Sequence, residues 1–323
     1  MNAVTYSQYG APEVAKVERV PMPVVGERDV LVRVEATSMS AADAAARLGA
    51  EPAARLYFGL RKPRFPVLGS DFSGTVVAVG SMVTQFAVGN AVVGAAGAKL
   101  VTHAEIVRLP ETAALVKRPA NLSAIDAVGV SEGGLTALHF VRDVAAAAPG
   151  KSVLIIGASG AVGSSAVQLA AHFGARVTAV CSAKNAQLVS LLGASEVIDY
   201  ASTDFTSNGK RYDVIFDAVA KRSYHATVGS LTPTGRYLST VPKLSVFIPI
   251  LLTKWSKGKR ARIAFAGLRP TELMRADLVE LMRLAANGNN APVSGGTFSF
   301  HNAAEAYRLV DSGRKTGTVV LVP

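Results

Sequence analysis

A glycine-rich turn near the middle of the chain has the spacing of a nucleotide-binding loop. Residues 153–163 read VLIIGASGAVG, an apolar run followed by closely spaced glycines. Gly160 would let the backbone approach a pyrophosphate, and Gly163 would let the helix pack closely on the strand. The free N–H groups at the start of that helix suit phosphate. A tight turn can use glycine for structure alone, but a strand, a helix and a second strand are all in place. We therefore expect a cofactor site comprising Gly157, Ser159, Gly160, Ala161, Val162 and Gly163.

The end of the next strand indicates which dinucleotide binds. NAD enzymes place an Asp or Glu about 20 residues after the turn, where it holds the ribose 2′-hydroxyl. No Asp or Glu occurs between Lys151 and Ser195, and Ser182 and Lys184 stand where the 2′ group would lie. A hydroxyl and an ammonium suit a 2′-phosphate, which a carboxylate would repel. Lys184 can also be an ordinary solvated lysine, but the missing acid favours NADPH.

The segments around this turn predict two kinds of structure. In the first third, Asp29–Ala36 alternates apolar and polar residues as a half-buried strand does, and Phe72–Val79 and Asn90–Val93 are similar. Many short strands with frequent Gly and Pro suggest a small barrel or sandwich. From Ser123, which can cap a helix, the pattern changes.

After residue 150, strands and helices alternate, which predicts a parallel sheet covered on both faces. The predicted strands are Val153–Ile156, Arg176–Cys181, Glu196–Tyr200, Asp213–Val219 and Arg236–Thr240, with helices at Gly163–Phe173 and Asn185–Leu192 between the first three. The tail adds a helix, Thr271–Asn287, and a strand, Gly317–Val322.

Composition limits the class of protein. A chain of 323 residues suits about two domains, and it contains no run of about 20 apolar residues that could span a membrane. The N-terminus lacks a basic region followed by an apolar core, so we expect a cytoplasmic protein. The single cysteine, Cys181, lies in an apolar run and is expected to be a buried thiol.

The net charge of +11 would suit nucleic acid, lipid or an anionic cofactor. Most of the charges are scattered, and the one dense cluster comprises Lys254, Lys257, Lys259, Arg260 and Arg262. No RNA-binding or helix-turn-helix signature accompanies it, so nucleic acid is not the expected partner.

Taken together, the motifs resemble the medium-chain dehydrogenase/reductase superfamily, in its zinc-independent quinone oxidoreductase-like branch. The resemblance covers nearly the whole chain. It is carried by SMSAADAAARLG (38–49), PVLGSDFSGTVVAVG (66–80), GLTAL (134–138), GASGAVGSSAVQLA (157–170), LGASEVIDY (192–200), YDVIFDAV (212–219), GRYLSTV (235–241) and RKTGTVVLV (314–322).

The resemblance implies an α/β protein with a GroES-like β-barrel catalytic domain, residues 1–121 and 271–323. A Rossmann NADPH-binding domain with a doubly wound parallel sheet, residues 122–270, would be inserted in it, with the active site between the two. The implied cofactor contacts are Thr136, Gly160, Ala161, Val162, Ser182, Lys184, Tyr200, Ala218, Val219, Ser239, Thr240, Val241 and Lys315. Tyr200 can equally be a strand-end aromatic residue.

The chain also departs from its zinc-dependent relatives. They have a Cys near position 38 and a His-Glu pair where this chain has Ser70 and Asp71. The structural run of four cysteines is absent, so we expect no metal. The branch often has Asn-Pro before its Asp, whereas here Ser40 and Ala41 precede Asp43. Ser40 can replace part of that polar contact, and Asp43 can instead fix its own loop, which we favour.

Without a metal, the favoured substrates are those that spread the incoming negative charge themselves. Quinones and α,β-unsaturated carbonyls do so, and one or two hydrogen-bond donors then suffice. The candidate catalytic residues are Ser40, Asp43 and Tyr57, with Tyr57 and Phe58 able to stack on a flat substrate. Surface packing explains these aromatic residues equally well.

The sequence leaves three hypotheses open. The first is an NADPH-dependent quinone or enone reductase, and the second is a zinc-free alcohol dehydrogenase or ketone reductase. The third is a non-catalytic NADPH-binding sensor or nucleic-acid binder. The resemblance also implies a homodimer joined through the Rossmann sheet edge near Gly235–Val241. The segment Val246–Arg262 could close the substrate pocket or extend the subunit interface, with a membrane surface as the less favoured alternative.

Overall fold

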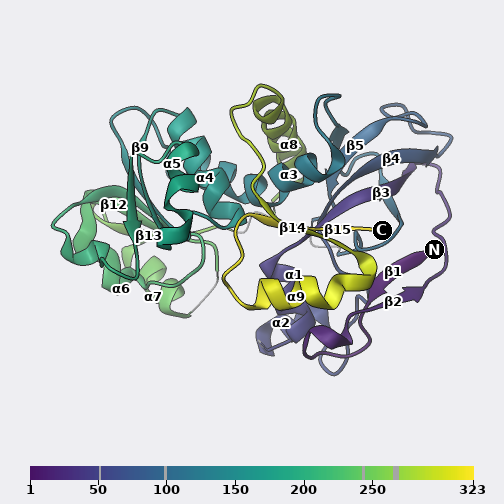
Figure 1. Ribbon diagram of the computed structural model, residues 1–323, viewed down its shortest axis with the longest axis horizontal. Coiled ribbons are helices and arrows are strands. Elements are labelled where there is room, and N and C mark those ends of the chain that lie inside the picture. Colours follow the sequence, from purple (N-terminus) through teal and green to yellow (C-terminus); the bar gives the residue numbers. More distant parts are fainter. Residues whose placement is uncertain (51, 98–99, 242–243, 265–268) are drawn as a thin grey trace. The chain divides into compact units, whose positions relative to one another are not determined.

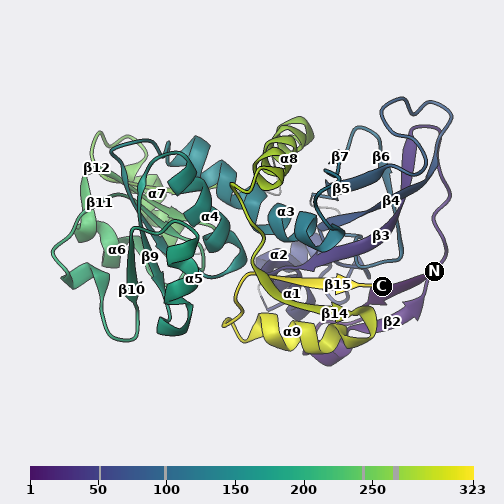
Figure 2. The ribbon, with the colours of Figure 1, turned by 45° about the horizontal axis from the view of Figure 1, so that its top comes forward.

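The computed structural model describes residues 1–50, 52–97, 100–241, 244–264 and 269–323. They form two units, drawn in Figures 1 and 2. Unit 1 comprises Met1–Glu132, Gly267–Gly288 and Pro292–Pro323, and unit 2 comprises Gly133–Ala266 and Asn289–Ala291. Among the described residues, no helix is both long and apolar enough to cross a membrane.

Unit 1 is built around a seven-stranded sheet in the order β14-β15-β3-β4-β5-β7, with β6 pairing β3. Its neighbouring strands are antiparallel except for β14 and β15. The strands are β3 (Asp29–Met39), β4 (Asp71–Val79), β5 (Ala91–Ala95), β6 (Ile106–Pro110), β7 (Ala114–Lys117), β14 (Ser294–Ser299) and β15 (Thr318–Val322), beside a hairpin of β1 (Asn2–Thr5) and β2 (Lys16–Arg19). Its helices are α1 (Ala41–Leu48), α2 (Pro52–Phe58), α8 (Thr271–Ala286) and α9 (Ala303–Asp311).

The alternation of apolar and polar residues predicted for Asp29–Ala36 is present in β3. Val30, Val32 and Val34 of β3 point into one hydrophobic cluster, where they meet Phe72 and Val76 of β4. Residues two apart on a strand share a face, so this spacing buries one face of β3. In a second hydrophobic cluster, α1 and α9 pack against residues of β1, β3 and β15.

Unit 2 is a six-stranded, wholly parallel sheet in the order β10-β9-β8-β11-β12-β13. The strands are β8 (Ser152–Ile156), β9 (Arg176–Cys181), β10 (Glu196–Asp199), β11 (Tyr212–Asp217), β12 (Leu231–Ser239) and β13 (Arg260–Ile263). The helices are α4 (Ala161–His172), α5 (Ala186–Leu191), α6 (Tyr224–Thr227) and α7 (Leu244–Thr253). The strand order reverses at β8, and α4 and α5 lie on one face of the sheet and α6 and α7 on the other (Figure 2). This confirms the doubly wound sheet.

The boundary between the units differs from the predicted one at residue 122. Helix α3 (Ala124–Leu138), capped by the Ser123 hydroxyl, begins in unit 1, because Thr318 Oγ1 donates to Gly129 O (3.3 Å) and to Glu132 Oε2 (2.9 Å). It continues into a π-helical stretch, His139–Val144. Residues 289–291 return to unit 2, because the Gln168 amide bonds both backbone groups of Ala291.

The strand expected at the edge of the unit 2 sheet is an inner strand. The segment Gly235–Val241 was expected at the edge of the sheet, but β12 is an inner strand that pairs with β11 and β13. Among the described residues the edge strand on this side is β13 (Arg260–Ile263), a four-residue segment inside the basic cluster that was not predicted as a strand.

Candidate cofactor and substrate sites

The glycine turn joins β8 to α4 and is held by the neighbouring strand. The N–H groups of Gly157 and Ala158 both donate to Val180 O, at 3.0 and 3.1 Å. Gly157 has a φ of +76°, and a Cβ there would lie 2.7 Å from Val219 Cγ1. Both the backbone conformation and the close approach therefore require glycine at this position.

The two later glycines of the turn serve different purposes. A Cβ on Gly163 would overlap the carbonyl oxygen of Gly157 and lie 2.8 Å from Ala158 Cα. A Cβ on Gly160 would meet only Gly157 O, at an ordinary 3.5 Å. Gly163 is thus required by packing within the protein, whereas the protein itself leaves room for a side chain at Gly160. That room is where a pyrophosphate would approach.

Gly160 is the N-cap of α4, and no side chain caps the first turn there. The first N–H groups of a helix lack partners within the helix, and they carry the positive end of its dipole. The donors of Ala161, Val162 and Gly163 are therefore oriented to receive an anion. These residues fit a dinucleotide phosphate.

Gly133 on α3 is a part of this arrangement that the sequence analysis missed. A Cβ at this position would overlap Ala161 O and lie 3.0 Å from Val162 N. The absence of a side chain lets α3 lie directly against the start of α4. The adjacent glycine pair inside a helical segment was the available signal, since glycine inside a helix usually has a packing reason.

Asn185, which was not predicted as a site residue, links two predicted residues, Ser159 and Ser182. Asn185 Nδ2 donates to Ser159 Oγ at 2.9 Å and to Ser182 Oγ at 3.4 Å. Asn185 thereby ties the glycine turn to the end of β9. Lys184 is exposed beside it, and Tyr200, just after β10, is 62% exposed.

The loops after β11 and β12 reach the same end of the sheet. Asp217, the last residue of β11, accepts from the N–H groups of Val219 (3.1 Å) and Arg222 (2.8 Å). Burial raises the pKa of this carboxyl, and the backbone donors oppose the shift. Thr240 Oγ1 donates to Ala218 O at 3.2 Å, so one loop holds the other. Ser239 Oγ accepts from the Val241 N–H at 3.3 Å.

The structure therefore brings most of the predicted cofactor residues together at the carboxyl ends of adjacent parallel strands, where nucleotides bind in this fold. Thr136 is half-buried on α3. Lys315 belongs to unit 1, where its ammonium donates to Gly317 O at 2.8 Å.

In unit 1, Ser40 and Asp43 form a capping box at the start of α1. Asp43 is fully buried, and its Oδ2 accepts from the Ser40 N–H (2.9 Å) and the Ser40 hydroxyl (2.6 Å). Its Oδ1 accepts from the Gly69 N–H at 3.0 Å. The Asp43 carboxylate thus joins α1 to the loop before β4, and the hydroxyl hydrogen of Ser40 is directed to it.

Tyr57, the third catalytic candidate, is 43% exposed at the end of α2. Its ring packs edge-on against Phe58, with centroids 5.1 Å apart, and tilts against Phe65 at 5.6 Å. These contacts give the ring a fixed position with one part facing outward.

The positions of the zinc ligands of relatives carry different chemistry here. Ser70 Oγ donates to Asp71 Oδ2 at 2.6 Å, and the Ser38 hydroxyl is buried. Burial raises the pKa of Asp71 to about 7, with Glu132 and Asp43 adding to the shift. Two hydroxyls and one carboxyl that is partly protonated near neutral pH do not match the Cys and His ligands that zinc prefers. Among the described residues, no three His, Cys, Asp or Glu side chains are grouped to hold a metal ion.

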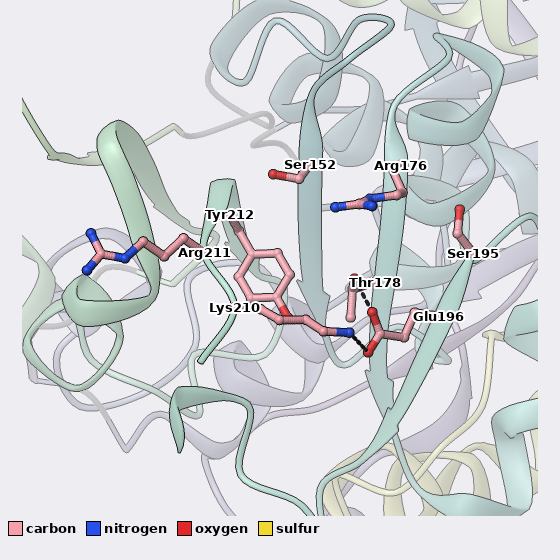
Figure 3. A pocket seen from close by; sticks show the side chains of 8 residues that line it. All are labelled: Ser152, Arg176, Thr178, Ser195, Glu196, Lys210, Arg211 and Tyr212. Atoms are coloured by element: carbon pink, nitrogen blue, oxygen red, sulfur yellow. Dashed lines mark hydrogen bonds and ion pairs between the residues drawn. The ribbon is translucent and has the colours of Figure 1, made fainter. Parts of the chain in front are cut away.

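A separate pocket lies at the opposite end of the unit 2 sheet (Figure 3). It has a volume of about 360 Å³ and is lined at the amino ends of four strands by Ser152, Arg176, Thr178, Ser195, Glu196, Lys210, Arg211 and Tyr212. Lys210 Nζ donates to Glu196 at 2.7 Å within it. Because the glycine turn follows the carboxyl end of β8, this pocket is not the cofactor site.

Two family models match the chain. The alcohol dehydrogenase GroES-like domain matches residues 26–136, and the zinc-binding dehydrogenase domain matches residues 192–321. These matches and the two units define an oxidoreductase of the medium-chain dehydrogenase/reductase class.

The relatives narrow this class. The chain is 31% identical to the chloroplastic quinone-oxidoreductase QR1 of Triphysaria versicolor, over 100% of this chain and 98% of that protein. It is 28% identical to a chloroplastic NADPH-dependent alkenal/one oxidoreductase of Arabidopsis thaliana, over 100% of this chain and 80% of that protein. This protein therefore belongs to the quinone oxidoreductase-like branch, as the motifs predicted.

Solved structures agree on the fold. The quinone oxidoreductase from Coxiella burnetii has a TM-score of 0.87 at 28% identity, covering 100% of this chain and 99% of that one. An NAD-dependent alcohol dehydrogenase has a TM-score of 0.84 at 27% identity, covering 100% of both. The fold alone therefore does not separate these two activities.

Proposed function

We propose that this protein is an NADPH-dependent reductase of quinones or α,β-unsaturated carbonyls that works without zinc. The proposal rests on the side chains at two places, namely the end of β9 and the positions that hold zinc in relatives. The end of β9 presents Ser182, Asn185 and Lys184 with no carboxylate on that strand or on the following helix. The positions of the zinc ligands hold Ser38, Ser70 and Asp71. The names of the quinone and alkenal/one oxidoreductase relatives support the same reaction class.

In this reaction the residues of the chain have three separate roles: cofactor binding, substrate contact and support of a loop. The start of α4 and the loops after β9 bind and orient the dinucleotide, which supplies a hydride when bound. We propose Tyr57 as the side chain that stacks on, or donates to, the substrate carbonyl. We assign Ser40 and Asp43 the role of holding α1 to the loop before β4, because the Asp43 carboxylate accepts three hydrogen bonds, from the Ser40 N–H, the Ser40 hydroxyl and the Gly69 N–H.

Substrate choice follows from the electrostatics. Reduction of a simple ketone concentrates negative charge on one oxygen, which zinc or a strong acid would have to stabilise. A quinone or enone spreads that charge over a conjugated system, so a single hydrogen-bond donor suffices. In an enone, the hydride is expected at the β-carbon, and the enolate then takes a proton from water or a nearby donor.

A substrate panel tests the proposal. NADPH oxidation should be much faster with quinones and enones than with saturated ketones, and it should survive chelators. Elemental analysis should find no stoichiometric zinc. Chelator-sensitive oxidation of simple alcohols, with no action on quinones or enones, would instead favour the alcohol dehydrogenase candidate, which the structural match to that enzyme keeps open. Absence of turnover together with a nucleic-acid gel shift would favour the sensor or nucleic-acid binder.

We also propose a homodimer, joined through β13 and α7 rather than through Gly235–Val241. Among the described residues β13 is an edge strand, and its Ala261 N–H donates to Thr253 Oγ1 of α7 at 3.0 Å, so we place the contact with a second copy on the edge that β13 and α7 form together. On α7 and just beyond it, exposed apolar side chains follow at helical spacing, namely Phe247, Ile248, Leu251, Leu252 and Trp255. Such a patch marks an interaction surface. Light scattering at micromolar concentration should give twice the chain mass, and Leu251→Glu should give a monomer.

The cytoplasm is the compartment we propose for this protein. Two of the named relatives are chloroplastic, so the family is not confined to one compartment. Fractionation of the source cells, with the protein recovered in the membrane-free supernatant, is the test.

A further inference from the structure

Asn185 is a bridge between the two segments that a dinucleotide must contact. Its amide nitrogen lies 2.9 Å from Ser159 Oγ in the glycine turn and 3.4 Å from Ser182 Oγ at the end of β9. All three side chains are half-buried. The turn itself is fixed to β9 by the two hydrogen bonds on Val180 O. Asn185 therefore adds a side-chain link beside an existing backbone link.

The direction of these hydrogen bonds decides what the serines can do. A serine hydroxyl has one hydrogen to donate and two lone pairs to accept with. Because the Asn185 N–H groups donate to both oxygens, the hydroxyl hydrogens of Ser159 and Ser182 point to other acceptors. A carboxylate at position 185 would do the opposite, since it only accepts and would attract both hydrogens.

The surrounding charge favours an anion as that other acceptor. Lys184 is exposed beside Asn185, and the start of α4 presents the N–H groups of its first turn next to Ser159. No Asp or Glu lies on β9, on α5 or in the glycine turn. Asp199 of the neighbouring strand β10 pairs with Cys181, and its carboxylate accepts from the Ala201 N–H at 3.1 Å. A phosphate oxygen is the acceptor that this set of donors suits.

We propose that Asn185 is a positioning residue for NADPH selectivity, which orients the Ser182 hydroxyl toward the 2′-phosphate and the Ser159 hydroxyl toward the phosphates at the glycine turn. This inference rests on the NADPH binding proposed above. It assigns the preference for NADPH to Ser159, Ser182 and Asn185 together rather than to Lys184 alone. Asn185 acts through the two serines, so its substitution should change how NADPH and NADH compare, not merely how well either binds.

The test is calorimetric measurement of the NADPH and NADH dissociation constants for Asn185→Asp. The variant turns both hydroxyls toward the new carboxylate and places a negative charge near the 2′-phosphate. NADPH binding should weaken about 10- to 100-fold, as expected for losing a hydrogen bond to a charged group, while NADH changes much less. The NADPH-to-NADH preference of the wild type should therefore fall by about tenfold or more.

Gln187→Glu is the matched control, because Gln187 is exposed on α5 two positions further along the chain. It adds the same charge without contacting the serines, so screening should limit its effect on NADPH to ~2-fold. The Ser182→Ala background completes a double-mutant cycle. If Asn185 acts through Ser182, Asn185→Asp should have a smaller effect in that background.

Asn185→Ala removes the donor without adding charge and covers the case in which the Asp variant fails to fold. It should weaken NADPH by about 3- to 10-fold and NADH less. A wild-type protein that binds both cofactors equally would refute the proposed cofactor itself. A wild type that prefers NADPH, with Asn185 variants that keep the full preference or lose both cofactors equally, would overturn the role of Asn185 alone.

Discussion

Gly163 lies so close to Gly157 that a Cβ on Gly163 would overlap the carbonyl oxygen of Gly157. Gly160, between them, has no such neighbour and would meet that same oxygen only at 3.5 Å. The two glycines of one motif, Gly160 and Gly163, therefore have separate physical causes. One glycine is needed for the protein to fold, and the other for the ligand to approach.

Gly160→Val should abolish NADPH binding while the protein stays folded, because the side chain fills the space of the pyrophosphate. Gly163→Val should instead lower the free energy of unfolding by about 1–3 kcal/mol or more, as other overpacking substitutions in cores do. Calorimetry and circular dichroism on both variants separate the effects. Normal NADPH binding by Gly160→Val would show that the cofactor site lies elsewhere.

Lys184→Ala should weaken NADPH by about ten- to a hundredfold and leave NADH nearly unchanged, because a charge-assisted contact to phosphate contributes about 1.5–3 kcal/mol. The comparison uses dissociation constants measured at one salt concentration, since exposed charges are screened. Equal losses for both cofactors would contradict a 2′-phosphate contact.

Ser40→Ala should lower the free energy of unfolding by about 1 kcal/mol, because it removes one half of the capping box on α1. If Ser40 serves only the loop, kcat at saturating substrate should change little at a temperature where the variant is folded. A large fall in kcat with unchanged stability would instead restore Ser40 as a proton donor to substrate. Chemical denaturation and steady-state kinetics on the same preparation decide between the two.

Asp71 should make stability depend on pH. Its folded-state pKa is raised to about 7, mainly by burial, against about 3.9 for an unfolded chain. Between these values the folded protein holds a proton that the unfolded chain has released. The free energy of unfolding should therefore fall as the pH rises from about 4 to about 7, by at most ~1.4 kcal/mol per pH unit from this group.

Asp71→Asn removes this titrating carboxyl, so the pH dependence of its stability is compared with that of the wild type. Relative to the wild type, the variant should gain stability between pH 5 and pH 8 in urea unfolding experiments. A constant difference across this range would mean that Asp71 is ionised throughout.

The sequence by itself determined the fold class and the cofactor turn. β8, β9 and β11 of unit 2 contain apolar runs bounded by glycine or polar residues, which are local properties of the sequence, and β9 begins and ends at the predicted residues. Cys181 is buried as expected, with its pKa raised to about 11 by burial. The glycine turn was found for the same reason, since its residues are adjacent along the chain.

Contacts between distant residues were decided only by the tertiary structure. Asn185 and Ser159 are far apart in sequence and meet because β8 and β9 are neighbours in a parallel sheet. Gly133 matters only because α3 lies against the start of α4. The edge strand β13 and the hydrogen bond from Gly69 to Asp43 likewise depend on strand order and loop packing. Periodicity and composition describe one segment at a time, whereas hydrogen-bond partners are set by which segments the fold places side by side.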